Sequence, residues 1–260
     1  MTAALLILLG GLAVLGLVVF VRWDDARAWR VSLTTYRLIL PQSLTTADVA
    51  AWLAHVVATT HASGLAVHVP PALGLEVTAD SNGITHTLIV PKNLTGSVLA
   101  GLRATLPAAR IEETPRVAGR AFTLAAEARL TSLLRPLAHD RAGLASASIL
   151  ASLQPLGSGE QITLQWLFTG VPTPAPAAAA NPSLSADAAR NARFKLAEPM
   201  LQAVVRLGIQ APSPRAPDIA AWLRGVAGLL IWPFVPFPVY RGLFARLLSA
   251  IIDERFTVAE

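Results

Sequence analysis

An apolar stretch without a charged side chain, residues 3–21, constrains the fold of this chain more than any other feature. It consists of Leu, Val, Ile, Ala and Gly with one Phe. A helix of about 19 such residues is roughly 28 Å long, close to the hydrocarbon thickness of a bilayer. The stretch lacks the basic start and the cleavage site of a secretory signal, and buried core helices are seldom apolar on every side. It therefore predicts a transmembrane helix.

The residues that follow the apolar stretch predict its orientation. They form a basic and aromatic flank: Arg22, Trp23, Arg27, Trp29 and Arg30. The positive-inside rule places such a flank in the cytoplasm, and tryptophan is common at membrane interfaces. We therefore expect residues 1–30 to be a single-pass anchor and juxtamembrane segment in the inner (cytoplasmic) membrane, with the C-terminal body in the cytoplasm.

Composition narrows the classes of function open to the body. The 260 residues include no cysteine, which excludes disulfides and thiolate metal sites. The formal net charge is +5, without a run of basic residues or an interleaving of basic with aromatic residues. Direct binding of nucleic acid is therefore not indicated.

The first part of the body, residues 31–118, has the pattern of a ferredoxin-like module. Its predicted elements follow in order: strand 31–40, a helix beginning at Thr45, strand 73–79, an Asn82-Gly83 turn, strand 84–90, helix 95–106 and strand 109–114. This is the βαββαβ order.

The second part, residues 119–260, reads as an irregular copy of the first. Its predicted elements are strand 121–130, helix 142–153, strand 161–168, a Pro/Ala linker at 170–183, a polar helix at 185–195, a strand at 200–209 for which a helix is the alternative, and helix 217–230. An apolar tail follows. Its aromatic residues are a possible interaction surface or a cap on the core: Trp232, Phe234, Phe237 and Tyr240. The predicted fold class is α+β, with a transmembrane helix followed by two ferredoxin-like modules, the second irregular.

No motif indicates catalysis. The sequence contains no P-loop, no HExxH and no G-x-S-x-G elbow. The spacing of His55, His61, His68, His86 and His139 does not indicate a metal site, although His68 and His86 could face each other across strands. We therefore assign no catalytic, cofactor-binding or metal residue and expect no enzyme activity and no cofactor.

Three segments carry a resemblance to a known family. They are TTYRLILPQSLTTADVAAWLAHVV, GLEVTADSNGITHTLIVPKNLTGSVLAGLRATLPAARIEE and ARFKLAEPMLQAVVRLGIQAPSPRA. Together they resemble the N-terminal region of actinobacterial conjugative type IV secretion coupling-type proteins, in which a membrane-anchored region precedes an FtsK/HerA-like motor ATPase. The present sequence has no Walker motif, so the resemblance implies a region that lacks the motor domain.

The resemblance implies a membrane-anchored, non-catalytic assembly module of a conjugative DNA-transfer ATPase system. The implied partners are the lipid bilayer and a motor ATPase or other secretion-apparatus subunit, with nucleic acid contacted only indirectly and a homo-oligomer possible. The alternative is a free-standing membrane-anchored adaptor with a duplicated ferredoxin-like body, unrelated to DNA transfer.

Overall fold

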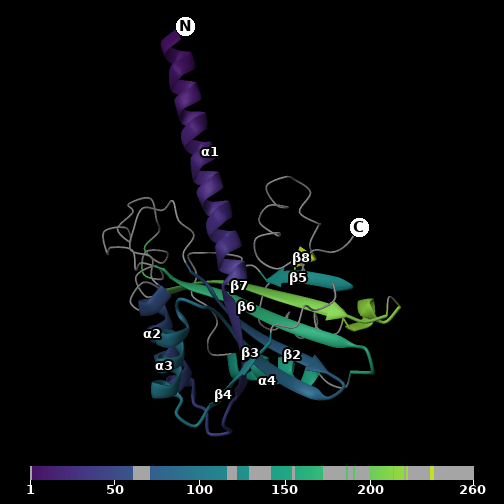
Figure 1. Ribbon diagram of the computed structural model, residues 1–260. Helices are drawn as coiled ribbons and strands as arrows, with labels where there is room; N and C mark the ends of the chain where they lie inside the picture. Colours follow the sequence, from purple (N-terminus) through teal and green to yellow (C-terminus); the bar gives the residue numbers. More distant parts are fainter. Residues whose placement is uncertain are drawn as a thin grey trace.

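A long helix and one sheet dominate the computed structural model. It describes residues 2–60, 71–115, 122–128, 142–153, 156–171, 200–212, 214–219 and 235–236, with single residues at 186, 190 and 221. Helix α1 (Thr2–Val31) projects away from a body built of strands and shorter helices (Figure 1).

All the described strands belong to one eight-stranded sheet. They are β1 (Leu33–Ile39), β2 (Leu73–Asp80), β3 (Gly83–Pro91), β4 (Arg110–Thr114), β5 (Leu124–Ala128), β6 (Gln161–Val171), β7 (Met200–Gln210) and β8 (Val235–Pro236). Their order is β4-β1-β3-β2-β6-β7-β5-β8, and the pairs with a recorded register are all antiparallel. The first half of the sheet consists of β1 to β4 and the second half of β5 to β8. From its outer edge inward, each half contains the fourth, first, third and second of its own strands in chain order. The two halves meet where β2 pairs with β6.

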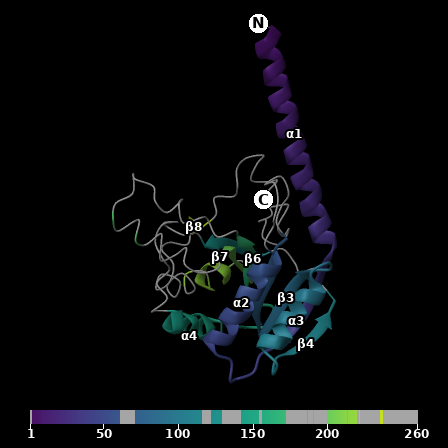
Figure 2. The same cartoon turned by 90° about the vertical axis from the view of Figure 1, so that its left-hand side faces the viewer.

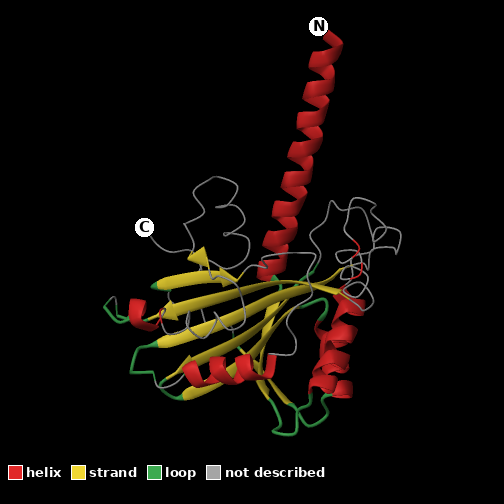
Figure 3. Cartoon of the chain, turned by 180° about the vertical axis from the view of Figure 1, so that it is seen from behind, coloured by secondary structure: helices red, strands yellow, loops and turns green. Residues whose placement is uncertain are grey.

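The helices that follow α1 in the chain cover one face of this sheet. Helices α2 (Thr46–Thr60) and α3 (Thr95–Thr105) lie over the first half, and α4 (Ala142–Ser152) lies beside the second (Figures 2 and 3). Trp52 of α2 packs edge-to-face on Phe168 of β6, with ring centroids 6.2 Å apart. Because α2 belongs to the first half and β6 to the second, the apolar core is shared by both.

Local chemistry explains where the first elements begin and turn. The Thr45 hydroxyl and the Asp48 carboxylate cap α2 reciprocally, since Asp48 N donates to Thr45 Oγ1 at 3.2 Å and Thr45 N donates to Asp48 Oδ2 at 3.1 Å. The Thr45 hydroxyl also donates to Asp48 Oδ2 at 2.6 Å, and this bond, followed by the one from Thr45 N, lowers the pKa of Asp48. The β2–β3 hairpin turns at Gly83, whose φ of 130° favours glycine.

The base of α1 is fixed to the sheet. Only Ser32 separates α1 from β1; its N–H donates to the carbonyls of Ala28 and Trp29, and its own carbonyl accepts from Lys92 N at 2.8 Å. Trp29 Nε1 donates to the carbonyl of Ala72 at 2.9 Å. The last turns of the helix are therefore part of the body.

The predicted transmembrane anchor is wrong. Within the described residues, no helix combines the length and the apolarity that crossing a bilayer requires. The sequence predicted a helix that stops at the basic flank, whereas α1 continues through the charged residues 22–30 to Val31. The predicted single-pass localisation in the inner membrane is therefore wrong as well.

The predicted fold class is also wrong as a whole. Two separate modules would each carry a free edge strand, whereas Leu73–Ala79 of β2 pairs with Ile162–Phe168 of β6 and makes one mixed α/β body with a continuous antiparallel sheet. The residue stretch 200–209 is a strand, which settles the helix alternative. The domain division at residue 118 stays a prediction. Most of the expected linker and of the helices at 185–195 and 217–230 lies outside the described residues.

Candidate functional site

The predicted flank residues lie together at the base of α1. The Arg27 guanidinium lies over the Trp23 ring, 5.6 Å from its centroid, and the Trp23 ring is 6.4 Å from that of Phe20. Arg22 is exposed, while Trp29 and Arg30 are partly buried. The flank thus belongs to a helix that packs on the body. The predicted surface Trp232, Phe234, Phe237 and Tyr240 lies outside the described residues.

Exposed apolar side chains surround the outer part of α1. Their exposed fractions run from 42 to 64 %, and they are Leu5, Leu8, Leu9, Leu12, Val14, Leu15, Leu17, Val19 and Phe20. Successive helix positions are about 100° apart, so these side chains point in every direction around the axis. Exposed apolar surface on this scale marks a contact surface. We call these nine side chains the apolar sleeve.

A row of polar side chains crosses the sheet face opposite the helices. Following the strand registers from β4 to β5, the row contains Glu112, Arg37, Thr87, Glu76, Gln165, Arg206 and Glu127. Its centre is buried, with 6 % of Glu76, 1 % of Gln165 and 7 % of Arg206 exposed. Gln165 Nε2 donates to Glu76 Oε1 at 2.6 Å. Glu76 and Gln165 are therefore a buried polar pair where the two halves meet. We call the pairing of β2 with β6 the seam.

Sequence reasoning missed this seam. The alternation in QITLQWLF does separate Gln165 from the apolar residues Leu164 and Trp166. It does not show that Gln165 lies beside Glu76, because that pairing joins β6 to β2, which is distant in sequence.

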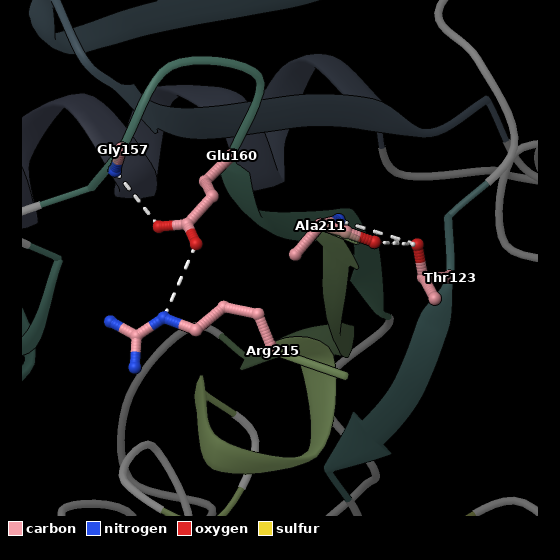
Figure 4. Close-up of polar contacts among 5 residues, drawn as sticks. All are labelled: Thr123, Gly157, Glu160, Ala211 and Arg215. Atoms are coloured by element: carbon pink, nitrogen blue, oxygen red, sulfur yellow. Dashed lines mark hydrogen bonds and ion pairs between the residues drawn. The ribbon is translucent and has the colours of Figure 1, made fainter. Parts of the chain in front are cut away.

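Polar contacts join the chain segments next to β5, β6 and β7 in the second half of the sheet (Figure 4). The Glu160 carboxylate accepts from Gly157 N at 2.8 Å and from Arg215 Nε at 3.2 Å, and the two side chains point toward each other. Thr123 Oγ1 donates to the Ala211 carbonyl at 2.9 Å. These contacts join the turn before β6, the start of β5 and the chain after β7. The Arg215 side chain is 52 % exposed, so solvent weakens its ion pair.

The described histidines take part in packing contacts. His55 Nε2 lies 3.1 Å from the carbonyl oxygen of Ser97, where α2 meets α3. His86 is half-buried on β3 opposite Leu38 and Val77, and burial lowers its pKa. The predicted proximity of His68 to His86 is untested because residue 68 lies outside the described part.

Within the described part of the chain, no three His, Asp or Glu side chains gather as metal ligands. The features that stand out are one exposed apolar surface and one buried polar seam. The first suits contact with another macromolecule, and the second suits the pairing of two halves of a sheet. Comparison with protein-family models and with curated proteins finds no match for this chain.

Proposed function

We propose that this chain is a non-catalytic assembly module of a conjugative type IV secretion ATPase system. In this proposal the apolar sleeve of α1 binds an apolar helical surface of the motor ATPase or of another subunit of the apparatus. The observation that carries the proposal is the exposure of apolar side chains on all sides of α1. The resemblance of the three sequence segments supplies the class of partner.

The energetics of the apolar sleeve support a role in binding. Burying one Leu or Val side chain contributes about 1.5–3 kcal/mol. Binding of another surface over the exposed leucines around Leu12 would therefore contribute a large favourable free energy. The base of α1 is held by Trp29 and Ser32, so a partner bound to the sleeve is held in a fixed orientation to the sheet.

Site-specific photocrosslinking in the native host tests this proposal. A photoreactive phenylalanine analogue replaces Leu12 on the sleeve or, as the control, Ile39, an exposed apolar residue on β1. We expect position 12 to capture a subunit with a Walker-type motor domain or another secretion subunit, and the second substitution Leu15→Glu to abolish this capture. A partner outside any DNA-transfer apparatus would instead favour the adaptor. Equal capture from positions 12 and 39 would refute a role for the sleeve.

A further inference from the structure

Strand β4 forms one outer edge of the sheet, and among the described strands it pairs with β1 alone. Its side chains alternate between the two faces of the sheet. Arg110 and Glu112 lie on the face opposite the helices, Glu113 lies on the helix face, and all three are exposed. Because side chains on both faces are open to solvent, the backbone N–H and C=O groups on the outer side of β4 can receive another strand.

The helix beside this edge leaves room for a second copy of the chain. Helix α3 lies beside β4 in Figure 2, and it contacts α2 where His55 fills the space next to Gly101. Successive helix positions are about 100° apart, so Gly96, Ala100 and Arg103 lie on the side of α3 turned away from α2. All three are exposed. Since α2 packs on β6, this open side of α3 faces the edge that β4 forms.

The charges of β4 select one way in which two copies can pair. A two-fold axis normal to the sheet makes the two β4 strands antiparallel and keeps the helices of both copies on one face. An axis through Arg110, Glu112 or Glu113 would bring two like charges together, which opposes pairing. An axis through Ile111 instead places Arg110 of each copy opposite Glu112 of the other. The two Ile111 side chains then lie opposite each other.

We propose that two copies of this chain associate through the outer edges of β4 and form one continuous sheet, with the two-fold axis at Ile111. Glu112 then lies between Arg37 of its own β1 and Arg110 of the other copy. Charged residues on an edge strand commonly discourage pairing. Here they oppose three positions of the axis and favour the one at Ile111, so they set the register. The inference rests on β4 and does not depend on the proposed function.

Disulfide trapping at single positions tests this pairing, even when the dimer is short-lived. The natural chain has no cysteine, so one substitution gives each copy a single thiol. In the full-length variant Ile111→Cys the two thiols face each other across the axis. The Cα atoms of such opposite residues are about 4.5–5.5 Å apart, which suits a disulfide. We expect mild oxidation to link most of this variant into dimers.

Glu113→Cys is the matched control on the same strand. Position 113 is more exposed than position 111, so random collisions would favour it. The proposed register separates the two control thiols by four residue steps, or roughly 13 Å along the strands, which a disulfide cannot bridge. The control should therefore give at least about tenfold less linked dimer. A yield from position 113 that equals or exceeds the yield from position 111 would refute the pairing.

Variants with changed charge test the register independently. Arg110→Glu and Glu112→Arg each turn two attractive contacts into two repulsive ones, so each variant alone should dissociate about tenfold more readily or worse in sedimentation equilibrium. A mixture of the two restores both contacts, because one chain then offers two glutamates and the other two arginines. Both positions are exposed, so the variants should keep the circular dichroism of the natural protein.

Different tags on the two variants make the restored pair measurable. We expect each tagged variant to capture the other far better than it captures a second copy of itself. Association through the apolar sleeve does not depend on these charges and would be equal in all of the mixtures. If the mixture associates no better than either variant alone, the charges of β4 do not set the pairing and the proposed dimer is refuted.

Discussion

Replacing Gly170 by alanine probes a close approach between the two halves of the protein. Gly170 lies near the end of β6, and its N–H donates to Thr60 Oγ1 of α2 at 2.7 Å in a buried position. A Cβ atom at this position would press on the carbonyl oxygen of Val57 and would lie 2.9 Å from the Val57 Cα and 3.0 Å from Thr60 Oγ1. Two of these three atoms belong to the backbone, so α2 or β6 has to move.

The expected cost of Gly170→Ala follows from these contacts. Overpacking of this kind costs about 1–3 kcal/mol. Displacing α2 also weakens the buried hydrogen bond to Thr60, which adds about 1 kcal/mol. We therefore expect the free energy of unfolding to fall by about 2–4 kcal/mol, which lowers Tm by roughly 4–16 °C for a chain of this size. Urea titration and thermal melting of the full-length protein, followed by circular dichroism, measure both quantities.

Gly96→Ala is the matched control for this prediction. Gly96 lies in the first turn of α3, and a Cβ atom there would meet nothing within 4 Å. The control substitution should stabilise the protein by about 0.4–1 kcal/mol, because alanine restricts the unfolded chain more than glycine does. If the two variants have the same stability, α2 and β6 do not meet as closely as described, and the shared core between the halves is refuted.

Three further predictions concern the polar groups. Gln165→Leu removes the 2.6 Å donor from the buried carboxylate of Glu76 and should lower the free energy of unfolding by about 1–3 kcal/mol in urea titration; an unchanged stability would contradict the described seam. Burial lowers the pKa of His86, so the unfolded chain takes up a proton first as the pH falls below the ordinary value of 6.5; the stability should fall on acidification through that range, and His86→Gln should flatten this dependence in melts at pH 5 to 8. Arg215→Met should change the stability by less than about 1 kcal/mol, because 52 % of the Arg215 side chain is exposed to solvent; a larger loss would show that the ion pair with Glu160 contributes more than this exposure suggests.

Local chemistry made the individual elements of the first half predictable. Asn82-Gly83 turns the hairpin, Thr45 caps α2, and Val98, Leu99 and Leu102 form the buried face of α3, as their spacing predicts. Each of these signals acts over a few residues, so no knowledge of distant pairing is needed to interpret it.

The sheet as a whole could not be predicted in the same way. Pairing of β2 with β6 joins residues about 90 positions apart, and it places the buried side chains of Glu76 and Gln165 side by side. The end of α1 was missed for a different reason. No Gly or Pro occurs between Gly16 and Val31, so nothing in the backbone breaks the helix where the apolar stretch ends. The change from apolar to charged residues after Val21 was taken as the end of the helix, which in fact continues to Val31.

The direct join of α1 to β1 through Ser32 has a mechanical consequence. Without a flexible hinge, the 30-residue helix is a stiff lever of about 45 Å whose pivot is the start of β1. A force applied at its tip is transmitted to the body as torque. One extra residue beside Ser32 would swing any load on the helix by about 100° about its axis.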